Sequence, residues 1–455
     1  MADCADFERE LPRGFGLSTA TYVVIASMVG VGILTTSGFT IKDTGSHTLM
    51  LGLWLIGGLL AMCGALTVAE LAAAMPKAGG EYVFVREAYG RPMAFLYGWI
   101  SFLIGFAAPT ALAAHSAGRY LIAPWVDVNH PSVLIITRAL AALFIILMTV
   151  AHLRGQAVGS GIQDISTVVK LAALLAIVVG GLALRRGDLG HFAPDLPQRG
   201  TPWSVLAISL VYIMFSYSGW NAASYIAGEV RDPHRTLPRS LLIGCGAVSV
   251  LYLLLNLVYV YALPAGELTA MTYEEVEPIA ALAAARLFGT GIATPLSIAI
   301  GLGLLATLSA YVLIGPRIYY AMARDGLFPA LAARLSPKTG TPNNAIVMQS
   351  AFALILLFSG TFREIVTYAG VGLSLSSFFV IAAIYVLRVA RPEMKRPFKT
   401  PGYPVVPFLF LACTAWMVVF SFLQEPLWSG ISVGTILAGV PVYCVWRSAT
   451  GRKTN

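Results

Sequence analysis

Charged residues are scarce in this chain of 455 residues. Asp, Glu, Lys and Arg make up 11% of the sequence, against roughly 25% in soluble domains. Hydrophobic residues make up 57%, and the mean hydropathy is +0.77. The shortage of charge excludes an ordinary soluble protein and predicts an all-α polytopic membrane protein. It also excludes a nucleic-acid-binding protein, because the net charge of +8 has no soluble basic domain to carry it.

Cysteine is also rare. Of the five cysteines, Cys4 lies in the polar N-terminal tail, and the others lie in apolar segments: Cys63, Cys245, Cys413 and Cys444. None falls in a segment that we expect outside the cell, where disulfides persist. We therefore expect no structural disulfide.

Motifs for catalysis and metal binding are missing. The sequence contains neither a GxSxG nor an HExxH pattern. His115, His152, His191 and His234 are scattered, without the i, i+4 spacing of a metal site. We expect no enzymatic activity, no metal and no cofactor.

Long hydrophobic runs dominate what is present. A crossing needs about 20 residues of helix, which divides the chain into twelve spans: 15–39, 48–74, 92–122, 133–152, 163–184, 204–228, 240–263, 292–322, 343–360, 366–388, 404–423 and 429–447. The polar start of the chain lacks the pattern of a cleaved signal peptide, so the first span should remain in the mature protein. Lys and Arg gather in the connections on the side of both termini. This predicts cytoplasmic N- and C-termini in the cell (inner) membrane, with basic loops contacting lipids.

Two spans carry glycine and hydroxyl residues at their centres: SMVGVGIL at 27–34 in the first and FSYSGWN at 215–221 in the sixth. Glycine weakens a helix, and hydroxyl groups satisfy backbone groups freed by unwinding. Because non-helical backbone at this depth is tolerated around a cavity, we expect the two breaks to face each other. Half-helix N-termini suit a carboxylate and freed carbonyls suit an ammonium group, so the pair suits a zwitterion. Close helix packing through small residues is the alternative for either motif alone.

The breaks also indicate an internal repeat. Spans one to five and six to ten each begin with an interrupted helix, and an odd number of spans per unit inverts the second copy. Amphipathic segments at 80–90 and 272–289 both end in an aromatic residue and a glycine, the first inside and the second outside. The expected domains are a cytoplasmic tail at 1–14, a transport core at 15–390 with repeats at approximately 15–184 and 204–388, helices eleven and twelve at 391–447, and a tail at 448–455. Scaffold or homodimer contact is the default role of the last two helices.

Lys170 stands inside the fifth span, and the segment carries no acidic residue beyond Asp164. An ammonium group in hydrocarbon costs roughly 2.5 to 3.5 kcal/mol, so it should face the bundle interior, where carbonyls can hold it. Lys170 is therefore a candidate coupling group. The alternative is a lysine whose side chain extends to the cytoplasmic interface.

Several motifs occur in an order that carries a resemblance: GVGIL at 30–34, AEL at 69–71, PKAGGEY at 76–82, FSYSGWN at 215–221, GEVRDPHRTLP at 228–238, GPR at 315–317 and ARDG at 323–326. Over nearly all of its length the chain resembles the amino acid–polyamine–organocation (APC) transporter superfamily, close to its L-type amino acid exchangers and their bacterial relatives. The resemblance implies a LeuT-like fold with discontinuous helices 1 and 6. It also implies secondary active transport of amino acids by alternating access.

The resemblance assigns roles to residues at the two breaks. In similar proteins the first-span N–H groups hold the substrate carboxylate, and carbonyls of both breaks meet its amino group. Phe215 matches the aromatic residue that closes over the substrate as an outer gate. The implied substrate-binding residues are Ser27, Met28, Gly30, Val31, Gly32, Phe215, Ser216, Ser218, Gly219 and Asn221.

Lys170 matches the fifth-span lysine of the family, which occupies the place of sodium in sodium-driven relatives. Sodium coupling is therefore not expected. In some relatives this lysine is the proton site, and in others it organises the first span. Tyr311 aligns with its hydroxyl partner, which is more usually Ser; Thr307 and Ser309 are the alternatives.

Two further departures from the family pattern bear on binding and partners. Val31 stands where similar proteins carry Ser or Thr, so carboxylate binding would depend more on backbone donors. The segment 121–131 lacks the cysteine by which animal exchangers join a partner, so we expect no disulfide-linked heavy subunit.

The sequence favours substrates with neutral side chains. Glu70, Asp164 and Glu229 all fall near cytoplasmic ends of spans, and a buried unpaired charge is costly. We therefore predict sodium-independent transport of neutral L-amino acids. Proton-coupled symport, and transport of cationic amino acids or polyamines, are the alternatives. Which amino acid is carried stays open.

Overall fold

The structure is a computed structural model that describes residues 13–77, 79–126, 130, 132–154, 156–195 and 200–450, with backbone alone at 156–166 and 449–450. Within these residues the chain is helical, and the β-structure is an isolated bridge between Phe15 and Val230. The prediction of an all-helical architecture is confirmed.

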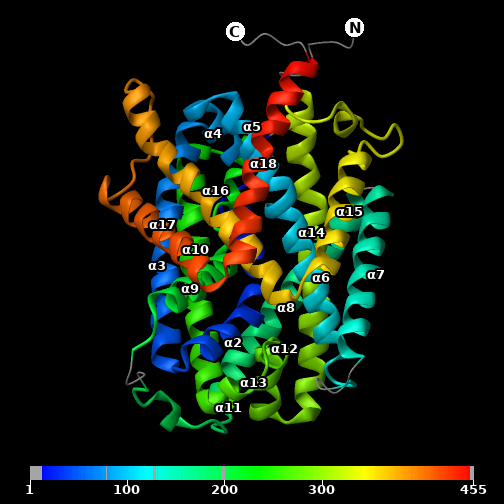
Figure 1. The fold of residues 1–455 in the computed structure, drawn as a ribbon, viewed down its shortest axis with the longest axis vertical. Coiled ribbons are helices and arrows are strands. Elements are labelled where there is room, and N and C mark those ends of the chain that lie inside the picture. Colours follow the sequence, from blue (N-terminus) through cyan, green and yellow to red (C-terminus); the bar gives the residue numbers. More distant parts are fainter. Residues whose placement is uncertain are drawn as a thin grey trace.

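Most helices lie along the long axis of the molecule (Figure 1). Their bounds are α1 Leu17–Met28, α2 Gly32–Thr44, α3 His47–Ala74, α4 Glu81–Tyr89, α5 Arg91–Ile100, α6 Ala107–Ile122, α7 Val133–Leu153, α8 Gln156–Ala183, α9 Trp203–Tyr217, α10 Pro233–Ala262, α11 Ala265–Ala270, α12 Tyr273–Val276, α13 Ile279–Phe288, α14 Thr290–Arg324, α15 Asn343–Ser359, α16 Phe362–Ala390, α17 Val405–Gln424 and α18 Pro426–Thr450.

Eight helical segments of the described chain are long and apolar enough to cross a membrane: α3, α5 continued by a π-helical turn into α6, α7, α10, α14, α16, α17 and α18. The pair α1 and α2, bent by 42° at their junction, forms a ninth. Shorter apolar stretches in α8, α9 and α15 fall at the fifth, sixth and ninth predicted spans. The described chain is therefore consistent with a membrane-embedded bundle of at least eight or nine apolar helices, and the count of twelve spans stays a prediction.

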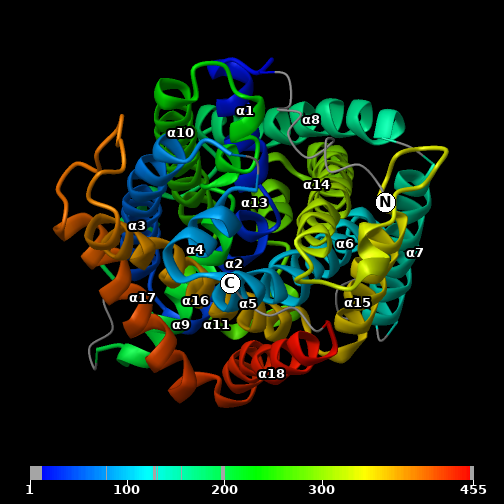
Figure 2. The same cartoon turned by 90° about the horizontal axis from the view of Figure 1, so that it is seen from above.

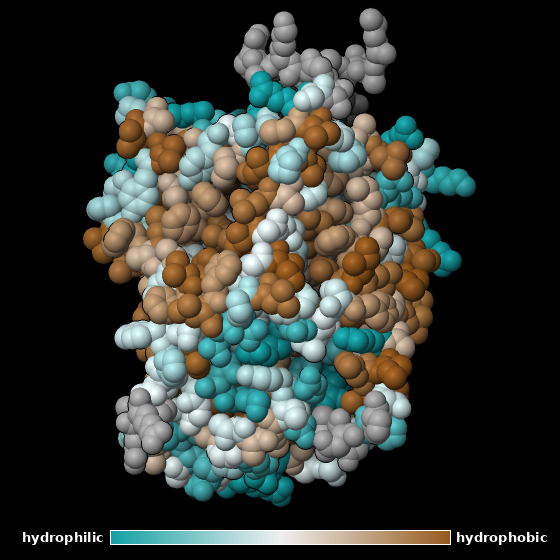
Figure 3. Space-filling model, in the orientation of Figure 1, coloured by the Kyte–Doolittle hydropathy of each residue, from teal (hydrophilic) through white to brown (hydrophobic). Residues whose placement is uncertain are grey.

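Hydrophobic residues spread over the upper and middle part of the visible face, whereas polar residues gather in its lower part (Figure 3). Large apolar side chains such as Leu59, Ile135 and Val419 are at least 60% exposed. A soluble protein rarely exposes so much apolar surface, and a bilayer covers it at no cost.

The two ends of the bundle carry different short helices. Figure 1 places α4 and the last turns of α18 at one end and α11, α12 and α13 at the other. The helices α4 and α13 both end in an aromatic residue followed by a glycine with positive φ, 82° at Gly90 and 74° at Gly289. The next helix begins at the following residue in both cases. A residue with a Cβ is strained in this conformation, so glycine allows the sharp turn.

The broken pair α1 and α2 is enclosed by other helices. Helix α10 packs on α1 and α3, helix α14 packs on α6 and α8, and helix α9 packs on α2, α16 and α17. Viewed along the long axis, α7, α8, α17 and α18 lie at the periphery, and α2 and α6 lie nearer the centre (Figure 2).

Candidate functional site

The first break lies where the sequence predicts it. Helix α1 ends at Met28, Val29 is extended with ψ of 90°, and α2 resumes at Gly32. The first N–H groups of a helix have no partner within it and carry its positive dipole end. The start of α2 therefore presents donors at the centre of the bundle.

The second break lies where we predict it, but the chain that follows it is not an α-helix. Helix α9 ends at Tyr217, and Gly219 takes a φ of +97°. The chain then runs through two short 3₁₀ turns, Ala222–Ser224 and Ala227–Glu229. We expected a second α-helical half here, so the expectation of a helix N-terminus at this break is wrong. The tight 3₁₀ turns leave a non-helical segment beside α1.

The two breaks pack backbone against backbone. A Cβ on Gly32 would lie 2.4 Å from Ser216 Cα, and a Cβ on Gly219 would lie 2.7 Å from Ser27 O. Thr36 and Ser216 share a hydrogen bond of 2.7 Å between their hydroxyl groups. The predicted meeting of the two motifs is therefore present, and glycine is needed at both contacts because no side chain fits.

Lys170 joins the first break to α14. Its ammonium group donates to Val29 O and, at 2.9 Å, to Thr307 Oγ1. The side chain is 1% exposed, and no described carboxylate lies within 4.0 Å of it. Gly303 makes room for it, since a Cβ there would lie 2.6 Å from Lys170 Cβ. The lysine thus faces the interior, and the interfacial alternative is not what the structure shows.

The two other candidate partners of Lys170 lie elsewhere. Ser309 bonds His152 Nε2 at 2.8 Å. The hydroxyl of Tyr311 lies beside Gly30, 3.8 Å from where a Cβ on that glycine would stand. Thr307 is therefore the partner in this conformation, and Tyr311 borders the break.

Tyrosine hydroxyls hold carbonyls that the broken helices release, a feature that the sequence reasoning missed. Tyr252 of α10 donates to Met28 O at 2.6 Å and to Ser216 O at 3.2 Å, which links both breaks. Tyr120 adds a bond to α2 just beyond the first break, where it donates to Leu34 O at 2.7 Å. In the sequence a tyrosine within an apolar span is not distinguishable from ordinary core, so no local signal marks these residues.

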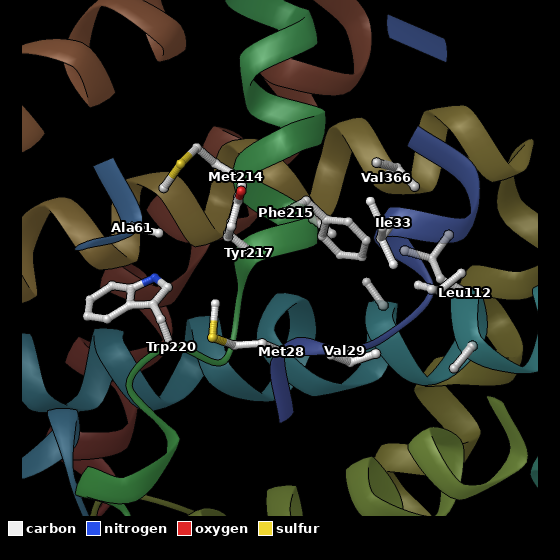
Figure 4. Packing of buried hydrophobic residues seen from close by; sticks show 14 of the residues in the cluster. Met28, Val29, Ile33, Ala61, Leu112, Met214, Phe215, Tyr217, Trp220 and Val366 are labelled. Atoms are coloured by element: carbon white, nitrogen blue, oxygen red, sulfur yellow. The ribbon is translucent and has the colours of Figure 1, made fainter. Parts of the chain in front are cut away.

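The surroundings of the breaks are apolar. Figure 4 shows the Phe215 ring directed toward Ile33 and Val366, while Met28 lies on the side of Trp220. At the polar edge, Ser218 N donates to Phe215 O, and Asn221 Nδ2 donates to Tyr225 OH at 3.4 Å. Apolar side chains therefore border the breaks, with an amide and a hydroxyl group at one edge.

The site is closed in this conformation. Met28, Val31, Phe215 and Ser216 are each no more than 4% exposed. These residues of the two breaks are therefore shielded from solvent in this conformation. Ion pairs lie toward both ends of the bundle.

One set of pairs, beside α12, centres on Arg363 at the start of α16. Its guanidinium bonds Glu425 at 2.6 Å and lies 4.2 Å from the centre of the Tyr273 ring. The Tyr273 hydroxyl donates to Asp43 at the end of α2. The second half of the first span is thus tied to α12 and α16.

A second set of pairs, at the end that contains α4, ties α4 and α3 to the ends of α14 and α16. Arg86 lies 3.4 Å from Asp325, and Glu87 lies 2.7 Å from Arg391. Arg388 binds Glu70 through two nitrogen atoms, at 3.0 and 2.7 Å. Such bidentate pairs are geometrically specific and close the end that contains α4.

Two interrupted helices whose backbones meet inside the bundle, with a buried lysine bonded to the first break, are typical of transporters with discontinuous helices. A family model described as amino acid permease matches residues 15–443. The chain therefore belongs to the amino acid permease family of the APC superfamily, whose members are membrane transporters rather than enzymes.

Curated relatives agree with this assignment. The chain is 28% identical over 442 residues to the human cystine/glutamate transporter, covering 95% of this chain and 85% of the relative. It is 28% identical over 441 residues to the mouse large neutral amino acids transporter small subunit 2, covering 95% and 81%. It is 29% identical over 442 residues to the human b(0,+)-type amino acid transporter 1, covering 95% and 88%.

Proposed function

We propose that this chain exchanges neutral amino acids across the cell membrane by alternating access and without sodium. The observation that carries the proposal is Lys170, whose buried ammonium group bonds Val29 O of the first break and Thr307 of α14. A fixed cation there supplies the charge that a sodium ion would otherwise bring to the unwound carbonyls. The relatives are named for the transport of amino acids, which supports the substrate class.

The two breaks offer complementary groups to a zwitterion. We assign the substrate carboxylate to the N–H groups of Gly30, Val31 and Gly32 at the start of α2. We assign the ammonium group to Met28 O and Ser216 O. In this conformation the Tyr252 hydroxyl donates to both carbonyls, so the substrate would share or displace this donor.

The character of the surroundings favours a neutral side chain. Phe215, Ile33 and Val366 supply apolar contacts around the second break (Figure 4). Ser218, Gly219 and Asn221 would border the substrate side chain, and none of them carries a charge to pair with a cationic or acidic group. Phe215 is the residue that we assign to the outer gate.

The topology that accompanies this function has twelve spans, with spans one to five and six to ten as inverted repeats. The equivalent aromatic-glycine turns after α4 and α13, at opposite ends of the bundle, support the repeat. We place both termini in the cytoplasm and helices α17 and α18 in the scaffold or a homodimer. The mouse relative is named a small subunit, but segment 121–131 has no cysteine, so we propose function without a disulfide-linked heavy subunit.

Uptake of radiolabelled alanine into proteoliposomes tests the proposal. We expect uptake to rise strongly when unlabelled amino acid is present inside and to stay the same when external sodium is replaced by choline. Alaninamide, which lacks the carboxylate, should compete poorly with alanine. A sodium requirement, equal competition by the amide, or accumulation driven by a pH gradient without internal substrate would each contradict neutral exchange.

A further inference from the structure

Glu81 is a buried carboxylate that the proposed transport cycle does not use. It begins α4, the short helix at the end of the bundle that we assign to the cytoplasm (Figure 1), and it is 4% exposed. The sequence reasoning overlooked it, because a glutamate at the start of an amphipathic loop helix is normally in contact with water. In the fold, however, neighbouring segments shield Glu81 from water.

Three segments of the chain surround this carboxylate. Oε2 accepts hydrogen bonds from Tyr97 OH of α5 at 2.5 Å and from Tyr225 OH at 3.2 Å. Tyr225 lies in the non-helical segment after α9 and also accepts from Asn221 Nδ2. The network therefore connects α4 and α5 to the segment that borders the candidate substrate site.

Neither a positive charge nor a full set of donors compensates the carboxylate. Glu81 Oε1 has no hydrogen-bond partner among the described residues, and neither does the buried Ser224 Oγ next to Gly80. No described Lys, Arg or His nitrogen lies within 4.0 Å of Glu81. A buried anion with one bare oxygen is costly, and a proton on that oxygen removes the charge.

The other charged groups of α4 and α5 are engaged with other partners. On α4 itself, Arg86 pairs with Asp325 of α14, and Glu87 pairs with Arg391 of α16. On α5, Arg91 donates to Asp325 O. Tyr97 and Tyr225 are thus the titratable groups that bond to Glu81, and both donate to it.

Burial therefore dominates the protonation of this group. It raises the pKa of Glu81, although the Tyr97, Asn221 and Tyr225 side chains act in the opposite direction. If the segment after α9 moves away, water reaches the carboxylate and its pKa returns toward the ordinary value of about 4.3. A conformation in which this segment covers Glu81 then binds a proton more tightly than one in which it does not.

We propose that Glu81 is a proton-binding site of the inner gate. When the segment carrying Asn221 and Tyr225 closes over α4, the carboxylate takes one proton from cytoplasmic water, and when this segment opens, the proton returns to the cytoplasm. The proton does not cross the membrane, so the site makes gate closure depend on internal pH without making the protein a symporter. This inference rests on the proposed alternating-access transport.

Gate closure depends on internal pH because it is linked to proton binding at Glu81. Between the pKa of the open state and the higher pKa of the closed state, gate closure weakens by up to about tenfold per pH unit as the internal pH rises. Above the closed-state pKa the dependence levels off. Exchange limited by inner-gate closure should therefore slow as the interior becomes more alkaline.

The first test detects the proton directly. Infrared difference spectra of the reconstituted protein, recorded between acidic and alkaline buffer, should show a protonated carboxyl band that is lost in Glu81→Gln. The matched control is Glu87→Gln, on the same helix but paired with Arg391, and it should retain the band. A band that survives in Glu81→Gln would overturn the proposal whether or not the protein transports amino acids.

The second test follows exchange in proteoliposomes at fixed external pH and varied internal pH. We expect the internal pH dependence of the native protein to be abolished in Glu81→Gln and kept in Glu87→Gln. Tyr97→Phe removes a hydrogen-bond donor to the Glu81 carboxylate, so the midpoint of the internal pH dependence should move about one unit toward higher pH. Tyr82→Phe is the control, because the Tyr82 hydroxyl bonds Asp325, and it should leave the midpoint unchanged. An identical profile in native protein and Glu81→Gln contradicts the inference, while an absence of exchange in the native protein instead contradicts the proposed function.

Discussion

The two breaks meet at one site but are held in different ways. The first is fixed by side chains from other helices: Lys170 on Val29 O, Tyr252 on Met28 O and Tyr120 on Leu34 O. The second is held mostly by its own backbone, with Ser218 N, Ala222 N and Ser224 N bonding carbonyls three residues earlier.

Because of this difference, we expect the two breaks to be disrupted by different kinds of substitution. The first break should fail when a distant side chain is removed, because that leaves a buried carbonyl without a partner. The second should fail when its local conformation is disturbed, because glycine and the tight turns carry it.

Removal of Lys170 is expected to have the largest effect. Lys170→Ala takes away a buried ammonium group and leaves Val29 O unsatisfied, so maximal exchange should fall by about 100-fold or more, even at saturating substrate. Thr307→Val keeps the bond to Val29 and should lose about tenfold or less. Exchange by Lys170→Ala within a factor of two of native would contradict the role of the lysine at the first break.

Gly32 and Gly30 provide a matched pair within the first break. Gly32→Ala places a Cβ 2.4 Å from Ser216 Cα, whereas the nearest atom to a Cβ on Gly30 is 3.8 Å away. Overpacking of this kind costs about 1 to 3 kcal/mol, so Gly32→Ala should weaken substrate binding by about 5- to 150-fold and Gly30→Ala by about twofold or less. Binding is measured by scintillation proximity on purified protein; similar affinities for both variants would show that contact between the breaks does not matter.

Substitutions of Phe215 test its assigned role as the outer gate at the second break. Its ring excludes water by bulk, so Phe215→Ala should slow exchange by about tenfold and Phe215→Trp should retain at least about half of the native rate. Because Phe→Ala also removes core packing, the melting temperature of both variants serves as the control. Native rates in both variants would place the gate elsewhere.

Gly219→Ala is expected to act on stability, through the local conformation of the second break. Gly219→Ala forces a Cβ onto a backbone with φ of +97° and toward Ser27 O, 2.7 Å away. Gly200→Ala is the control, because Gly200 also has positive φ, at +69°, but nothing lies within 4 Å of its added Cβ. We expect Gly219→Ala to lower the free energy of unfolding by about 1 to 3 kcal/mol more than Gly200→Ala. Equal melting temperatures for the two variants would mean that the second break adapts without strain.

Local chemistry made the first break and the apolar helices predictable. Glycines in an apolar run weaken a helix wherever it packs, and the break at residues 29–31 falls inside the motif that indicated it. A lysine in the same kind of run must turn inward because hydrocarbon does not solvate it, and Lys170 does so. The all-helical class was predictable because hydrocarbon offers no hydrogen-bond partners, so each apolar run must satisfy its own backbone groups within the bilayer.

Packing between distant segments decided the rest. The rotation of α14 directs Thr307 to Lys170 and Ser309 to His152, a choice that three nearby hydroxyl residues leave open in the sequence. Helix α9 is not resumed as an α-helix after Gly219, although the residue types would allow it. Glu81 became a buried carboxylate because two tyrosines from other segments close over it. Composition and local pattern thus determined which elements form, because solvation acts on each residue separately, whereas partners and protonation followed from contacts that exist only after the helices are packed together.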